Sequence, residues 1–181
     1  MKRQVHLNLF IHSRGHHEAA WRHKNATPLL LTDFRYYEDL AKKAEDAAFD
    51  SIFLSDILSL GPDIEYTPRA VLDPVPLAGA LAAITKKIGI IGTASTTYSA
   101  PYNLARQFAS LDHISNGRIA WNIVTTASGH AASNYSADPQ AGIEERYKRA
   151  DEFMKVVNGL WDSWAEDAVV DDRASGQYTL P

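Results

Sequence analysis

Four histidines lie close together near the start of the chain, at His12, His16, His17 and His23. A histidine in a pocket can act as a general base or hold a substrate anion, because its ring titrates near neutral pH. His12 and His16 are four residues apart, a spacing that suits a metal ion only on a helix, and this segment has the polar pattern of a loop. We therefore expect no metal site. The histidines either have a role in a pocket or lie at the surface, partly packed by Trp21.

Two further polar positions follow apolar runs that resemble buried strands. Asp56 comes directly after the run from 51 to 55, where it could form a site or only cap the next segment. Thr93 belongs to the sequence Gly-Thr-Ala-Ser-Thr-Thr of residues 92–97. Small side chains and hydroxyl groups would let a planar ring approach the backbone and would bind its edge, although the same composition also suits a plain turn.

Asn122 and Tyr147 complete the set of candidates. Asn122 stands inside the apolar run from 118 to 124, and a buried amide needs hydrogen-bond partners. Because an amide both donates and accepts, it suits the alternating edge of a heterocyclic ring or a structural bond within the sheet. Tyr147 follows Glu144, Glu145 and Arg146 at the start of a helix, where backbone amides could bind a phosphate. A charged first turn with a tyrosine in the core explains the same residues.

Several classes of function are excluded by what the sequence lacks. It has no Gly-x-Gly-x-x-Gly, no P-loop and no Gly-x-Ser-x-Gly motif. It has no cysteine, which excludes disulfides, thiolate metal sites and a cysteine nucleophile. The formal net charge of -4, without a basic cluster, argues against nucleic acid as a partner. Short apolar runs and the absence of a signal-peptide pattern predict a cytoplasmic protein without membrane contact.

Four strand–helix units must position these residues. Continuous apolar runs predict strands at 5–11, 51–55, 88–94 and 118–124, buried on both faces. Apolar residues at helical spacing predict helices that begin at Thr32 or Asp33, at Asp73, at Pro101 and near Glu144. The last helix is expected to bury the side that carries Tyr147. After Trp164 the pattern dissolves, so we expect no further regular element.

Alternating strands and helices predict an α/β protein with a parallel sheet, either open and doubly wound or closed into a barrel. The three long loops, 12–31, 57–72 and 125–142, all follow strands, whereas the connections from helix to strand are short. Long loops at the carboxyl ends of strands favour a TIM barrel, where such loops build the site. A barrel needs eight strands and about 250 residues. We therefore expect residues 1–181 to form the amino-terminal half of a (β/α)8 barrel, a single incomplete domain.

Segments along nearly the whole chain, taken in order, resemble the bacterial-luciferase-like flavin-dependent monooxygenases. The class concerned includes nitrilotriacetate, EDTA, dibenzothiophene-sulfone and long-chain alkane monooxygenases. The most specific stretch runs from Leu-Asp-His at 111–113 to Trp-Asn-Ile-Val-Thr at 121–125. The supporting segments are Gly15-His16-His17 with 20–23, 54–56, 92–96, 105–110 and 145–153.

The resemblance implies a luciferase-like TIM barrel that binds reduced FMN and uses molecular oxygen to oxygenate a small organic substrate. In this two-component arrangement a separate NAD(P)H-dependent flavin reductase supplies the reduced FMN. The resemblance further implies that FMN contacts Asp56, Thr93, Asn122 and Tyr147, and that His17 lies near the substrate as the catalytic residue. We expect a homo-oligomer.

Two departures from the family pattern define the alternatives. Family members often carry a histidine four residues before the helix tyrosine, at the flavin phosphate, and here that position is Ile143. They are also more than twice as long, and a half barrel leaves two unpaired strand edges. One alternative is a non-catalytic, truncated half-barrel fragment that self-associates. The other is a deazaflavin-dependent oxidoreductase of the same superfamily. The substrate is left open.

Overall fold

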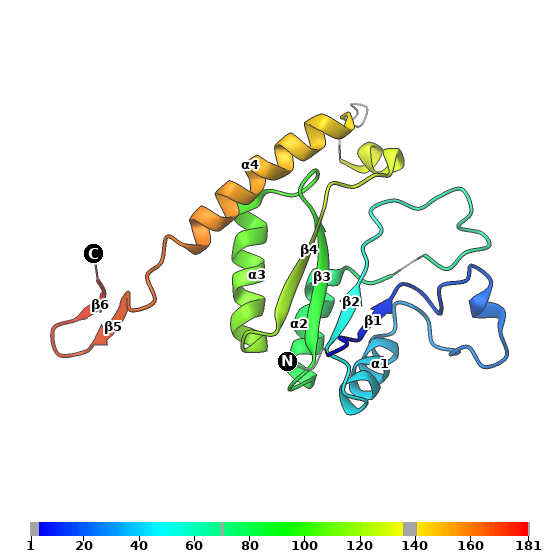
Figure 1. The fold of residues 1–181 in the computed structure, drawn as a ribbon, viewed down its shortest axis with the longest axis horizontal. Helices are drawn as coiled ribbons and strands as arrows, with labels where there is room; N and C mark the ends of the chain where they lie inside the picture. The colour runs from blue at the N-terminus through cyan, green and yellow to red at the C-terminus, as the bar shows by residue number, and fades with distance from the viewer. Residues whose placement is uncertain (1–3, 70, 136–140, 181) are drawn as a thin grey trace.

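A four-stranded parallel sheet forms the centre of the computed structural model, which describes residues 4–69, 71–135 and 141–180 (Figure 1). Its strands are β1 (Asn8–Ile11), β2 (Ser51–Leu54), β3 (Gly89–Ser95) and β4 (Ile119–Val124). The helices are α1 (Phe34–Asp46), α2 (Pro74–Ile84), α3 (Pro101–Ser115) and α4 (Ile143–Trp161). Two 3-10 helices, η1 (Ala20–Arg22) and η2 (Gly129–Asn134), lie in long loops, and an antiparallel hairpin of β5 (Val169–Asp172) and β6 (Gln177–Thr179) follows α4.

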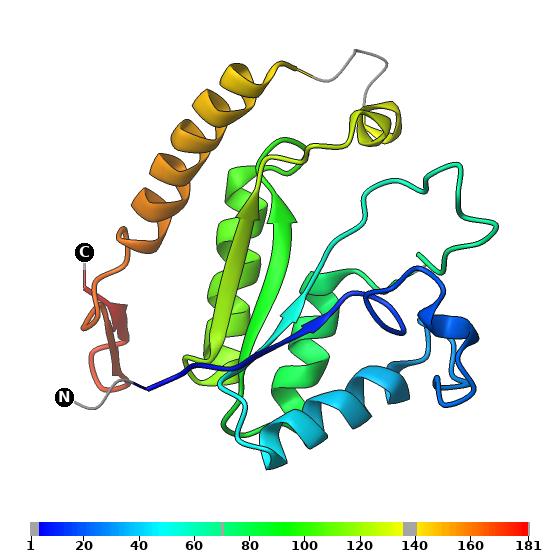
Figure 2. The same ribbon diagram turned by 45° about the vertical axis from the view of Figure 1, so that its right-hand side comes forward.

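The strand order decides between the two architectures. Each strand pairs in parallel with the next strand in sequence, in the order β1-β2-β3-β4, whereas a doubly wound sheet reverses its order at a switch point. The helices also contact one another in sequence, α1 with α2, α2 with α3 and α3 with α4. They follow the sheet as one layer (Figure 2), like the outer ring of a barrel. The first four βα units of a barrel are therefore confirmed.

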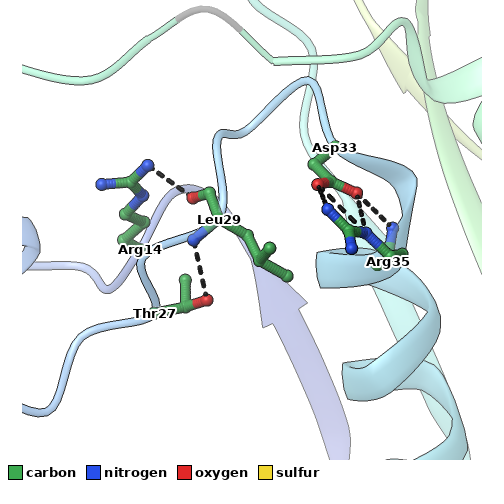
Figure 3. A network of polar contacts seen from close by, with 5 residues as sticks. All are labelled: Arg14, Thr27, Leu29, Asp33 and Arg35. Carbon is green, nitrogen blue, oxygen red and sulfur yellow. Dashed lines mark hydrogen bonds and ion pairs between the residues drawn. The ribbon is translucent and has the colours of Figure 1, made fainter.

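The helices begin where local capping chemistry places them. The side chain of Asp33 accepts from the N–H of Arg35 at 3.0 Å and so caps α1. The same carboxylate pairs with the guanidinium of Arg35 (Figure 3), and 2.5 Å separates Oδ2 of Asp33 from Nη2 of Arg35. Asp73 caps α2 by accepting from the N–H of Val75 at 2.8 Å, and Pro74 takes the first helical position, where no amide hydrogen is needed.

Side-chain contacts with the backbone order the long loop after β1. Arg14 donates to the carbonyl oxygen of Leu29, whose own N–H donates to the hydroxyl of Thr27 at 3.3 Å (Figure 3). Trp21 donates from Nε1 to the carbonyl oxygen of Tyr66 at 3.0 Å. The loops after β1 and β2 therefore support each other at the carboxyl side of the sheet, where a barrel places its site.

The main core lies between the sheet and the helix layer. Ile52, Leu54 and Ile90 of the strands face this layer and are buried with Leu77 and Leu81 of α2. A smaller cluster joins α3 to α4 and includes Leu104, Phe108, Phe153 and Val157. Within the described ranges, no helix is both long and apolar enough to cross a lipid bilayer.

Three expectations about burial and the last segment are wrong. Burial on both faces is found only at the carboxyl end of β3, where residues 92–95 are all buried. Strand β2 buries every second residue and β4 buries none. The reason is that only the helix layer covers the sheet, so the opposite face stays open. Helix α4 buries Phe153 and Val157, while Tyr147 is 60% exposed.

The hairpin β5–β6 follows Trp164, where the sequence predicts no element. Its strands are too exposed and too rich in aspartate to show the apolar alternation of a half-buried strand. The predicted loop 125–142 contains η2, and its residues 136–140 lie outside the described residues.

Candidate active site

A cavity of about 560 Å³ opens at the carboxyl ends of β2, β3 and β4. Side chains alternate along a strand, and Ile52 and Leu54 face the helices, so Phe53 and Ser55 face the opposite side. That side becomes the interior of a barrel, and we call this hollow the inner cavity. Its size falls within the range of ordinary cofactor pockets, about 300–1,000 Å³. The residues that line it include His12, Ser55, Asp56, Arg69, Thr93 and Asn122.

Thr93 and Asn122 are paired across β3 and β4 at the floor of the inner cavity. Asn122 donates from Nδ2 to the hydroxyl oxygen of Thr93 at 3.1 Å, and that hydroxyl donates to the carbonyl oxygen of Leu54 at 2.7 Å. Among the described residues, none donates a hydrogen bond to Oδ1 of Asn122. The two bonds therefore fix the amide orientation and leave its oxygen as an acceptor for a ligand. Thr93 is buried, and its hydroxyl proton is already used.

Asp56 forms part of the wall between the inner cavity and a second hollow of about 260 Å³, which we call the outer crevice. Asp73, Gln107 and Tyr135 also line the outer crevice. Burial raises the pKa of Asp56 to about 6, and the nearby carboxylate of Asp73 adds to the rise, while the N–H of Ile57 acts against it. Asp56 therefore titrates close to neutral pH, as groups that exchange protons in active sites do.

Of the four clustered histidines near the start of the chain, His12 is the one that lines the inner cavity. Its Nδ1 lies 3.4 Å from the hydroxyl of Ser55, and its ring stacks on that of His16 with centroids 5.4 Å apart. Burial lowers the pKa of His12, and the charges of His16 and Arg69 lower it further. A neutral imidazole with a free nitrogen can accept a proton. The sequence signal for His12 is its position directly after β1. The same rule, that a polar residue directly after a strand can form the site, identified Asp56.

His17, the predicted catalytic residue, lies elsewhere. It is exposed, its Nδ1 accepts from the N–H of Ala19 at 3.1 Å, and it is not among the residues that line the inner cavity. Its role near a substrate stays a prediction. Within residues 4–69, 71–135 and 141–180, no cluster of three histidine or acidic side chains could hold a metal ion.

Tyr147 and Ile143 share the first turns of α4, away from the inner cavity, and are 60% and 66% exposed. Arg146 donates to a backbone carbonyl of the preceding loop at 2.6 Å. Arg149, which sequence reasoning missed, donates from Nε to the carbonyl oxygen of Thr96 at 3.0 Å and so fastens α4 to the end of β3. The predicted flavin contact of Tyr147 stays a prediction.

The end of β4 contains a backbone feature that the sequence does not signal. Thr126 has a φ of 51°, in the left-handed region that β-branched residues rarely adopt. Its hydroxyl donates to the hydroxyl oxygen of Ser95 at 2.6 Å, which holds the strand ends of β3 and β4 together. Such conformations persist only where the surrounding contacts impose them, and they are concentrated at functional sites.

Comparison with known proteins agrees with this geometry. The sequence matches the luciferase-like monooxygenase family over residues 5–179. N-acetyl-S-(2-succino)cysteine monooxygenase of Bacillus subtilis (strain 168) is 44% identical over 177 residues, which cover 98% of this chain and 40% of that protein. Nitrilotriacetate monooxygenase component A of Aminobacter aminovorans is 38% identical over 190 residues, or 98% of this chain and 42% of that protein.

A solved structure of a riboflavin lyase, with modified FMN and riboflavin, matches with a TM-score of 0.88 at 35% identity. The match covers 99% of this chain and 42% of that chain. The chain thus spans about two fifths of the length of the relatives it matches, 40% and 42% for the two monooxygenases. Four sequential βα units, a site at their carboxyl ends and a match over nearly the whole chain lead to one assignment: the chain belongs to the luciferase-like monooxygenase family.

Proposed function

We propose that this chain supplies the flavin-binding half of a two-component, FMN-dependent monooxygenase. The observation that carries the proposal is the side chain of Asn122, which Thr93 orients at the floor of the inner cavity with its oxygen available to a ligand. This is the carboxyl end of the sheet, where barrels of this kind carry their chemistry. Residues 1–181 would form the amino-terminal half of the complete barrel.

The residues of the inner cavity fit the ring of a flavin. One edge of that ring alternates hydrogen-bond donors and acceptors. Asn122 offers an acceptor, and Asp56 offers an acceptor or, when protonated, a donor. When bound, reduced FMN supplies two electrons to molecular oxygen, of which one atom goes to the substrate and the other to water.

His12 is the residue that the geometry favours for proton transfer beside a substrate. It lines the inner cavity next to Ser55, and its lowered pKa keeps the imidazole ready to accept a proton. The family resemblance favours His17 for the same role, and substitution of each histidine distinguishes them. Loss of turnover with unchanged FMN affinity is expected for the histidine that serves the substrate.

The part of the site that would bind the phosphate of FMN is weaker than the part that would bind its ring. Ile143, the first residue of α4, has no group that can bind phosphate. We propose that the backbone amides of the first turn of α4, together with Tyr147, bind the phosphate instead. Glu144 and Glu145 in the same turn oppose an anion, so the phosphate is expected to contribute little to affinity.

The proposal extends to partners and location. A separate NAD(P)H-dependent flavin reductase would deliver reduced FMN, in agreement with the name of one relative, which is called component A of its monooxygenase. Since NAD(P)H is available in the cytoplasm, we place the protein there. We also propose a homo-oligomer, because β1 and β4 form the two edges of the sheet.

The test is a titration of the purified chain with FMN, followed by flavin fluorescence, together with its mass in solution. Saturable quenching is expected, with affinity reduced about tenfold or more in Asn122→Ala. Asn103→Ala, at an exposed position of α3, is the matched control and should bind as the wild type does. A folded chain that does not bind FMN would be the non-catalytic fragment. Preferential binding of a deazaflavin would indicate hydride transfer instead.

A further inference from the structure

The outer crevice brings together two carboxyl groups from different elements. Asp56 follows β2 and lines both the inner cavity and the outer crevice, whereas Asp73 lines only the crevice. Asp73 is held in place because its Oδ1 accepts from the N–H of Val75 at the start of α2. It is also exposed, so the crevice connects Asp56 with solvent on the side away from the inner cavity.

Tyr135 stands beside these two carboxyl groups. Its ring stacks on Tyr98 with centroids 4.4 Å apart, and the neighbouring Asn134 donates to the carbonyl oxygen of Leu58 at 2.8 Å. These contacts hold the end of η2 against the loops after β2 and β3. Burial raises the pKa of Tyr135, and Asp56 and Asp73 raise it further, which agrees with their proximity.

We propose that Asp56 takes up a proton from solvent when FMN fills the inner cavity, and that Asp73 is a positioning residue that promotes this uptake. Asp73 acts through Asp56, because the two carboxyl groups share the outer crevice. The inference rests on the proposed function, since it needs FMN in that cavity. The inference adds that the binding of flavin is coupled to the uptake of one proton. It also gives Asp73 an influence on the inner cavity, although Asp73 does not line that cavity.

The physical reason is that bound FMN makes a charged Asp56 costly. In the free protein, burial and then Asp73 already raise the pKa of Asp56 to about 6. FMN would remove water from the cavity side of Asp56 and add negative charge, and both effects favour the neutral carboxyl group. If only the protonated form binds, affinity is constant below about pH 6 and falls about tenfold per pH unit above it.

Other titratable groups face Asp56 from the inner cavity: His12 at the end of β1, Asp63 and Arg69 in the loop after β2, and His130 in η2. Arg69 pairs with Asp63 at 2.9 Å, so these two charges largely cancel. Protonation of His12 would also favour an anion at low pH. The charges that shift the pKa of His12 are those of His16 and Arg69, so a substitution of Asp73 separates the two effects.

The experiment measures the FMN dissociation constant of the full chain from pH 5.5 to 8.5. Asp73→Asn keeps the cap of α2, because an asparagine oxygen accepts the same N–H, but it removes the charge. The fall in affinity should then begin at lower pH, so that Asp73→Asn binds several-fold more weakly than the wild type at pH 7.5 and equally at the acidic end. Asp33→Asn makes the same change at the cap of α1, outside the crevice, and should keep the wild-type profile.

Asp56→Asn mimics the protonated group and should bind FMN with little dependence on pH. Calorimetry in buffers of different ionisation enthalpy gives a direct readout: about one proton taken up per FMN at pH 7.5 in the wild type and none in Asp56→Asn. FMN binding without proton uptake, or an Asp73→Asn profile equal to that of the wild type, would overturn the coupling and leave the flavin site standing. Absence of FMN binding at every pH would overturn the proposed function and the coupling with it.

Discussion

Arg118, just before β4, donates from Nη1 to the hydroxyl of Thr85 at the end of α2, at 3.0 Å. The same guanidinium donates to the carbonyl oxygens of Ala82, Thr85, Ile88 and Ser115. The side chains of Thr85 and Ser115 are buried. This network lies at the amino ends of β3 and β4, opposite the inner cavity, at the end of a barrel that provides stability rather than chemistry.

Arg118→Lys should therefore destabilise the fold by about 2–3 kcal/mol, because a lysine ammonium cannot reach these acceptors with the geometry of a guanidinium. FMN affinity of the folded protein should not change. Urea unfolding followed by circular dichroism gives the free energy of unfolding. Arg106→Lys, at an exposed position of α3, is the control and should stay within about 0.5 kcal/mol of the wild type. Equal losses in both variants would contradict the role of the network.

Thr93→Val tests whether Thr93 serves the flavin site by orienting Asn122. The substitution keeps the branched shape but removes the hydroxyl that accepts from Asn122 and donates to Leu54. Without this bond the amide loses its fixed orientation, and FMN affinity should fall about fivefold to tenfold, equivalent to about 1–1.4 kcal/mol. Thr93→Ser restores the hydroxyl and should recover most of the affinity. Wild-type binding by Thr93→Val would show that Asn122 needs no such support.

Ile143→His tests the place of the phosphate. A histidine at the first position of α4 would add a charge-assisted hydrogen bond to a phosphate at that helix end, so FMN should bind about fivefold to tenfold more tightly. Riboflavin, which has no phosphate, should bind as it does to the wild type, and fluorescence titration measures both. A similar gain for riboflavin would mean that the new side chain contacts the ring and that the phosphate lies elsewhere.

The sequence predicts those parts of the fold that local chemistry determines. Asp33 and Asp73 mark helix starts because a cap depends only on the next few residues. Asp56, Thr93 and Asn122 line the inner cavity because each stands at or near the carboxyl end of its strand, and their contact with FMN stays a prediction.

The wrong predictions concern residues whose burial depends on distant parts of the chain. The exposure of β4 depends on which elements cover it. The position of His17 depends on the path of a long loop without periodicity, so its role stays a prediction. Helix α4 shows the same limit, since its apolar stripe predicts a buried face that has too few partners to cover Tyr147.

Asp56 should also make the stability of the fold depend on pH. Its pKa is raised to about 6 in the folded state, compared with about 3.9 for an unperturbed aspartate. The folded state then binds more protons than the unfolded state between these values, so stability is lost as the pH rises from about 4 to beyond 6. Asp56→Asn removes this loss. At pH 7.5 its Tm should exceed that of the wild type by about 2–4 °C, or about 1 kcal/mol after discounting for partial exposure.

At pH 4 the two proteins should melt at nearly the same temperature, because Asp56 is then protonated in the folded wild type as well. Scanning calorimetry at both pH values makes the comparison. Asp46→Asn, at an exposed position near the end of α1, controls for the loss of one negative charge and should show no such pH-dependent gain. If Asp56→Asn were equally stabilising at pH 4 and pH 7.5, its effect would come from packing, and the buried charge would not be the cause. If it were destabilising at pH 7.5, the carboxylate of Asp56 would be a stabilising group, and the raised pKa would be wrong.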